Sequence, residues 1–91
     1  MNAQTTFRTE QAKRYLGTLC KHFSHKVPVE LDGNSGRIEL PFGQCELDAS
    51  GDGLNMKVSA ETKADLDKTA QVIASHLERF AFRENPQIEW H

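Results

Sequence analysis

The stretch that decides the fold is residues 27–58, VPVELDGNSGRIELPFGQCELDASGDGLNMKV. Apolar and polar residues alternate through four short runs in it, and Gly, Asn, Asp, Ser and Pro gather between the runs. Alternation with a period of two puts one face of each strand in the core and the other in water, which is typical of antiparallel strands joined by turns. The alternating apolar positions are Val27, Val29, Leu31, Ile38, Leu40, Cys45, Leu47, Leu54, Met56 and Val58. The stretch therefore predicts four consecutive antiparallel strands that need a cover on one face.

An amphipathic helix is predicted on each side of this stretch. Thr9 is expected to cap the first helix, which ends near His25, and Ser59 to cap the second, which ends near Arg83. A proline follows each predicted end and cannot continue a helix. Gly17 lowers the helix propensity of the first segment and is interpreted as a point of close packing. The apolar stripes are Ala12, Leu16, Leu19 and Phe23 in the first helix, and Leu66, Ala70, Ile73, Leu77 and Phe80 in the second.

The two ends of the chain complete the expected architecture. Residues 3–7 alternate and predict a short first strand, whereas Ile88 and Trp90 alternate in a tail that adds an edge strand or packs across the core. The predicted fold class is α+β, with an antiparallel sheet of four to six strands and two helices packed on one face, in the order β-α-β4-α. With 91 residues, the chain is expected to form a single domain, 1–91.

Composition narrows the classes of function. The net charge is −2 and basic residues are interleaved with acidic ones, so no Lys/Arg cluster is expected to hold a nucleic acid. No apolar run is long enough to span a membrane, and residues 1–6 lack the basic and apolar regions of a signal peptide. We therefore expect a soluble, cytoplasmic protein with no membrane partner. In that compartment Cys20 and Cys45 are expected to be free thiols that are buried as small hydrophobic residues.

Three histidines form the first candidate site. His22 and His25 are three residues apart on the first predicted helix, and His76 flanks the apolar stripe of the second. Imidazole is a common metal ligand, so the three rings could converge on a metal ion, whereas Cys20 falls on the other side of its helix from His22. The Cys-x-x-Cys spacing of many metal sites is missing, which favours a structural or interface role for the histidines.

The water-facing side of the predicted sheet is the second candidate. If Leu40 lies opposite Cys45, then Glu39 faces Glu46, and these like charges need a basic neighbour, a bound cation or a basic partner. An ordinary solvated face is the competing interpretation, because such ladders usually neutralise themselves. The residues expected on this face are Glu30, Arg37, Glu39, Gln44, Glu46, Asn55 and Lys57.

Motifs of catalysis are missing from the sequence. Ser24-His25 and Ser75-His76 are sequence neighbours, and neighbours on a helix do not face each other. There is no Gly-x-Ser-x-Gly elbow and no glycine loop ahead of a helix that would cradle a phosphate. These observations favour a protein that is not an enzyme, and they name no cofactor.

Four segments of the chain resemble a bacterial family known as domain of unknown function 2218 (DUF2218). They are residues 15–29 (YLGTLCKHFSHKVPV), 36–43 (GRIELPFG), 45–47 (CEL) and 75–84 (SHLERFAFRE). The family has no assigned activity, but similar domains occur fused to flavin reductases that release iron from ferric siderophores. The resemblance thus implies an accessory role in iron handling, by association and not by mechanism. The segments that it marks as places for a site contain His22, His25, Lys26, His76, Glu78 and Arg79.

Three hypotheses follow. The leading one is a non-enzymatic binding or accessory module whose surface lies where residues 22–26 approach the second helix. Its partner would be a protein such as a flavin reductase, or a small ligand. The second is a metal or thiol site that uses His22, His25 and His76, with Cys20 as a further ligand. The third is a structural dimer joined through an exposed sheet edge. Across the three hypotheses, we expect the chain to be a monomer or a weak dimer.

Overall fold

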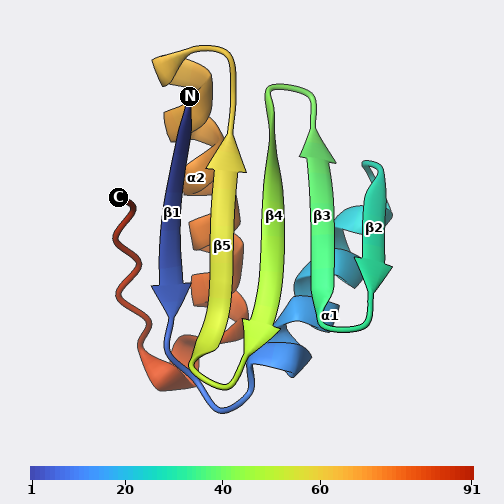
Figure 1. The fold of residues 1–91 in the computed structure, drawn as a ribbon, viewed down its shortest axis with the longest axis vertical. Coiled ribbons are helices and arrows are strands. Elements are labelled where there is room, and N and C mark those ends of the chain that lie inside the picture. The colour runs from blue at the N-terminus through green and yellow to red at the C-terminus, as the bar shows by residue number, and fades with distance from the viewer.

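The computed structural model describes residues 1–91 and contains one sheet and two helices. All neighbouring strands are antiparallel, in the order β1-β5-β4-β3-β2, and both helices cover the same face of the sheet (Figure 1). The elements are β1 (Asn2–Phe7), α1 (Ala12–Ser24), β2 (Val29–Asp32), β3 (Ser35–Leu40), β4 (Gly43–Ser50), β5 (Gly53–Ser59), α2 (Lys63–Phe80) and the single 3-10 turn η1 (Phe82–Glu84). The predicted α+β class and element order are confirmed, with five strands in the sheet.

The core lies between the sheet and the two helices. α1 packs on β2, β3, β4 and β5, and α2 packs on β1, β4 and β5. Ile38, Cys45 and Val58 lie side by side on three neighbouring strands and are completely buried. Burial of such apolar side chains is the main favourable contribution to folding, so the alternation in residues 27–58 explains why the helices cover this face.

The register of β3 against β4 differs from the one considered from the sequence. Ile38, not Leu40, lies opposite Cys45, so Glu39 faces Gln44 and Glu46 faces Arg37. The turn is tighter than expected, because Leu40 already pairs with Gly43 and only two residues lie between them. The predicted contact between two carboxylates is therefore wrong, and an acid faces a base instead.

Both predicted helix caps lie too early in the chain. Ser59 still belongs to β5, and α2 is capped by Thr62, whose Oγ1 accepts a hydrogen bond from the backbone N–H of Asp65. Thr9 accepts a hydrogen bond from the N–H of Gln11, but α1 begins only at Ala12, so Thr9 shapes the turn ahead of the helix. Several polar residues that could act as caps precede each helix, and only the path of the backbone selects between them.

The C-terminal segment runs beside β1 at the edge of the sheet (Figure 1). Gln4 and His91 exchange two backbone hydrogen bonds, of 2.8 and 3.1 Å. Ile88 and Trp90 are half-buried against the core, although residues 85–91 form no regular strand. Both alternatives for this tail therefore hold in part: it pairs with the edge at one point and packs on the core.

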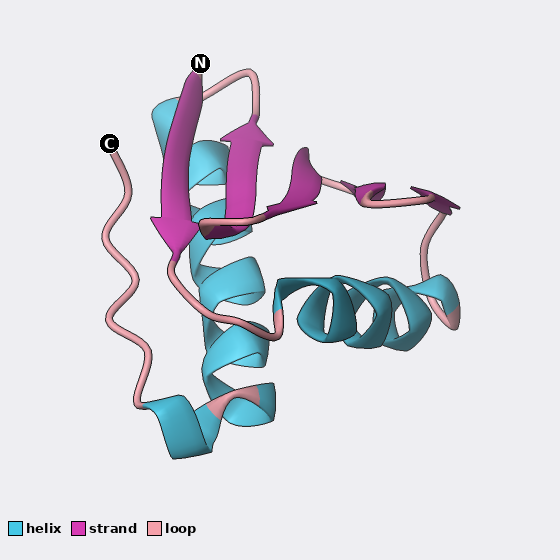
Figure 2. Ribbon diagram, turned by 60° about the horizontal axis from the view of Figure 1, so that its bottom comes forward, coloured by secondary structure: helices cyan, strands magenta, loops and turns pink.

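One face of the sheet stays free of helices. In the view of Figure 2 both helices lie on the same side of the strands. Neither helix combines the length and the hydropathy that a membrane span requires. On this free face the strands hold side chains in register, with no helix above them.

Candidate functional site

The junction between α1 and α2 brings His22 and His76 together. Their ring centroids lie 5.0 Å apart, and the ring of Phe23 lies 4.7 Å from that of His76. Phe80 lies 5.5 Å from His22 and meets its ring edge-on. The two histidines therefore belong to a cluster of four packed rings that joins the helices, and this arrangement fits the structural role weighed from the sequence.

The electrostatic surroundings of His22 are positive. Partial burial lowers the pKa of His22, and the nearby charges of His76, Lys26, His25 and Arg79 lower it further. No carboxylate forms an ion pair with any of these residues. The neutral imidazole is favoured at this position, because a proton there would meet only like charges.

Four of the other predicted site residues lie at the surface around this junction. His25, which follows the end of α1, is exposed, as are Lys26, Glu78 and Arg79. Glu78 makes no hydrogen bond or ion pair with the cluster. The structure thus gathers His22, His25, Lys26, His76 and Arg79 at one end of the helix pair, and it gives Glu78 no contact with them.

The geometry at the junction offers two metal ligands but no complete metal site. The Nδ1–H of His76 donates a hydrogen bond of 2.6 Å to the carbonyl oxygen of Val72, which leaves Nε2 as the free acceptor. Histidines that bind metals commonly hold their second nitrogen in this way. No group of three His, Cys, Asp or Glu side chains is arranged to hold a metal ion.

The two thiols lie in the hydrophobic core. Cys20 is 2% exposed and Cys45 is fully buried. Burial raises the pKa of both thiols, and that of Cys45 rises to about 12. A thiolate is the form that binds metals and attacks electrophiles, so these neutral thiols act as packing groups, as expected from the sequence.

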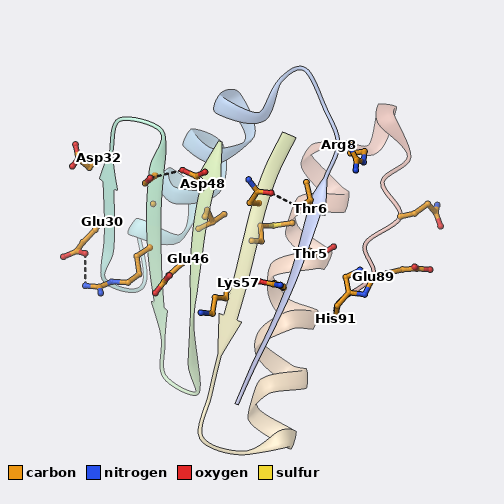
Figure 3. A pocket seen from close by; sticks show the side chains of 18 residues that line it. Thr5, Thr6, Arg8, Glu30, Asp32, Glu46, Asp48, Lys57, Glu89 and His91 are labelled. Carbon is orange, nitrogen blue, oxygen red and sulfur yellow. Dashed lines mark hydrogen bonds and ion pairs between the residues drawn. The ribbon is translucent and has the colours of Figure 1, made fainter. Parts of the chain in front are cut away.

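The free face of the sheet carries a hollow of about 1030 Å³. Strand residues form its floor, and Gln87, Glu89 and His91 of the C-terminal segment form one rim. Figure 3 shows Glu46 and Lys57 near the middle of this face, with Glu89 and His91 on the C-terminal segment at one side. We call this region the sheet hollow.

Two rows of side chains cross the sheet hollow. The first alternates in charge across four strands and ends at a neutral amide, whereas the second contains carboxylates, hydroxyls and an amide but no base. The first row is Glu30, Arg37, Glu46, Lys57 and Gln4, and the second is Asp32, Ser35, Asp48, Asn55 and Thr6. Acidic side chains exceed basic ones in the sheet hollow as a whole, with five carboxylates (Glu30, Asp32, Glu46, Asp48 and Glu89) against Arg8, Arg37 and Lys57.

Only some of the polar side chains in these two rows form ion pairs or hydrogen bonds with one another. Arg37 forms an ion pair of 2.8 Å with Glu30, and Ser35 donates a hydrogen bond to Asp48 (Figure 3). Glu46 and Lys57 lie opposite each other on β4 and β5, yet they form no ion pair within 4.0 Å. The sheet hollow therefore keeps charged groups that are free to contact a ligand.

Comparison with known proteins identifies the family. The family model described as "Uncharacterized protein conserved in bacteria (DUF2218)" matches residues 4–91. The chain belongs to the DUF2218 family. The resemblance noted from four sequence segments is thereby confirmed.

A solved relative supports the fold of this DUF2218 chain. The NMR structure of PA4090 from Pseudomonas aeruginosa is similar, with a TM-score of 0.78 and 37% sequence identity. The match covers 99% of this chain and 92% of that one. No curated protein sequence matches the chain.

Sequence reasoning named the water-facing side of the sheet as a candidate, and Glu30, Arg37, Glu46, Asn55 and Lys57 do line the sheet hollow. It missed the concave shape of that face, its C-terminal rim and one feature of the charge distribution. The hollow depends on the C-terminal rim and the strand register, neither of which follows from local alternation. The charges were treated as interleaved, but residues 11–29 contain four Lys or Arg residues and no Asp or Glu. Counting charges segment by segment would have found that feature.

Proposed function

We propose that this DUF2218 chain is a non-enzymatic binding module and that the sheet hollow is its ligand-binding surface. The observation that supports this is the hollow itself, which is concave, lies on a rigid sheet and is lined almost entirely by polar side chains. Binding sites are commonly concavities in which a few polar groups converge from a scaffold that does not move.

Charge points to the class of ligand. Carboxylates outnumber permanent cations by five to three in the sheet hollow, and the row that contains Asp32 and Asp48 has no base. An ammonium or guanidinium group can donate hydrogen bonds to these acceptors and neutralise the excess charge. The proposed ligand is therefore a molecule with several cationic groups, such as a polyamine or a Lys/Arg-bearing segment of a protein.

A titration with spermidine, followed by NMR, tests this proposal. We expect shift changes confined to residues of the sheet hollow, and about fivefold weaker binding in the Glu46→Gln/Asp48→Asn variant, which corresponds to about 1 kcal/mol. Glu10→Gln/Glu78→Gln removes the same number of exposed carboxylates outside the hollow and should leave the affinity unchanged. Equal losses in the two variants would show that spermidine only follows net charge, and the proposal would fail.

A transition-metal site at the helix junction is the second candidate. It is supported by the 5.0 Å separation of the His22 and His76 rings and by the hydrogen bond that leaves Nε2 of His76 free. Two imidazoles bound to one tetrahedral metal at about 2 Å place their centroids about 5 Å apart. Zinc should then bind with one ion per chain and lose affinity in His22→Gln and in His76→Gln, but not in His91→Gln. Binding that survives the two junction variants would remove this candidate.

An accessory role in iron handling is the cellular context that we propose. The support for it is family membership together with the fusions to siderophore-interacting reductases that the resemblance implies. Co-purification from iron-limited and iron-replete cells of the native host tests this role. Enrichment of a flavin reductase or an iron complex only under limitation is expected, and identical preparations from both conditions would contradict it.

A further inference from the structure

The outward face of α1 is a second surface with its own chemistry. The segment 11–29 carries four Lys or Arg residues and two histidines without a single carboxylate. Five of the six side chains are exposed and the sixth, His22, is half-buried. We call this surface the basic helix face; it consists of Lys13, Arg14, Lys21, His25 and Lys26, whereas His22 packs into the helix junction.

The charges of the basic helix face are not neutralised within the molecule. The ion pairs of the structure join Arg37 to Glu30 and Glu39, and Lys63 to Asp67, so none involves α1. The guanidinium of Arg14 donates a hydrogen bond only to the neutral side-chain amide of Gln11. Exposed cations that gather along one helix repel one another and attract an acidic partner.

Gly17 lies in the middle of this face, and the fold does not require it. A Cβ placed on Gly17 would meet no atom within 4 Å, so the close packing expected from the sequence is absent within the chain. Glycine inside a helix weakens that helix relative to almost any other residue. Positions three and four residues apart are neighbours on a helix, so Gly17 separates Arg14 and Lys13 from Lys21 and bares the backbone between them.

We propose that the basic helix face docks an acidic helix of a partner protein, whose backbone packs closely against Gly17. The complementarity of charge selects the acidic partner, and the bare glycine allows a second helix to approach between the basic side chains. α1 has 13 residues and is about 20 Å long, which suits a partner helix of similar length.

Two other classes of partner fit the surface less well. A membrane surface would require apolar side chains to insert, but the exposed large apolar residues, Met1, Leu31 and Phe82, lie outside α1. Nucleic acid favours an unbroken line of donors, whereas the centre of this face is occupied by Gly17 and offers none. This docking surface is independent of the sheet hollow, because α1 covers the opposite face of the sheet.

The test measures binding of the full chain to a fluorescently labelled, Glu-rich helical peptide of about 20 residues. We expect salt-sensitive binding that weakens about tenfold in Arg14→Gln/Lys21→Gln and at least threefold in Gly17→Gln. Glutamine is a better helix former than glycine, so Gly17→Gln should keep or raise the thermal midpoint, and its loss of binding would not reflect unfolding.

Matched controls separate docking from simple attraction of charges. Lys63→Gln/Lys68→Gln removes two cations from α2, and Gly51→Gln makes the same exchange at another glycine with open space around it. Both controls should bind like the wild type. Absence of binding, or losses that follow charge but ignore Gly17, would overturn the proposal. So would tighter binding to a 20-base-pair DNA duplex or to vesicles with 30% anionic lipid.

Discussion

The sheet hollow and the basic helix face are both rich in charged side chains but organise charge in opposite ways. On the sheet, Glu46 stands between Arg37 and Lys57, because three strands bring residues of distant sequence into one row. On α1, no cation forms an ion pair, and the segment 11–29 contains no carboxylate. A sheet can neutralise charge across strands, whereas an isolated helix face depends on what its own segment contains.

The difference is hidden in the net charge of the chain. Residues 11–29 contain four cations and no carboxylate, whereas residues 30–58 contain six carboxylates and two cations. The total of −2 therefore conceals a basic helix and an acidic sheet. A whole-chain charge near neutrality therefore does not exclude charged binding surfaces. Both surfaces rest on the same hydrophobic core, so a change in that core should affect both.

The largest effect is expected from a substitution that weakens the core shared by the two surfaces. Leu77 on α2 is fully buried in the core, so Leu77→Ala should lower the free energy of unfolding by about 2–5 kcal/mol. Chemical denaturation measures this loss, and spermidine and peptide binding should fall together as the folded fraction falls. Ser75→Ala, at an exposed position of the same helix, should change stability by less than about 0.5 kcal/mol. If only one surface lost binding, the two would not depend on a common core.

Removing the positive charge of Arg37 should affect binding at the sheet hollow but not at the basic helix face. Arg37→Gln removes the partner of Glu30 and the basic neighbour of Glu46, so the sheet hollow becomes more acidic. Stability should fall by no more than about 1 kcal/mol, because an exposed ion pair contributes little. Spermidine should bind about threefold more tightly, whereas binding of the acidic peptide to α1 should not change. Weaker spermidine binding would mean that Arg37 itself contacts the ligand.

The smallest effect is a dependence of stability on pH that arises at the helix junction. The pKa of His22 is lowered below its ordinary 6.5, first by partial burial and then by His76 and other nearby cations. The unfolded chain therefore takes up the proton at a higher pH than the folded chain does. This contribution to stability is complete above pH 6.5 and is lost as the pH falls through the lower pKa of the folded state.

Thermal unfolding between pH 7.5 and 5 checks that direction. The thermal midpoint of the wild type should decrease toward acid, and the decrease should be shallower in His22→Gln. An NMR titration of the His22 ring should give a pKa below 6.5. A ring that titrates above 6.5 would show that a carboxylate reaches it in solution.

Much of the fold was predictable, and the reasons are local. Alternation marked Ile38, Leu47 and Met56 as interior positions, and all three are buried. The apolar stripe of each helix likewise marked its buried face. The register of β3 against β4 was not predictable, because the length of the turn at Pro41 shifts every pair without changing the alternation.

The candidate sites were predictable only in pieces. His22 and His76 were recognised as flanking the stripes of different helices, but their contact depends on how α1 and α2 cross. The sheet hollow needs the C-terminal segment to pair with β1 through Gln4 and His91. Gly17 was noticed as a weak point of the helix, and its role was misread because the sequence does not show what lies opposite a residue.

By itself, the amino-acid sequence determined the kinds of element, their order, the faces they bury and the interior position of both thiols. These follow from the spacing of apolar residues, which acts over a few neighbouring positions. Only the tertiary structure decided which charges meet, where the sheet is hollowed and which two histidines touch. Those contacts join residues that are distant in the chain, and the packing of the whole core, not any local pattern, sets the distances between them.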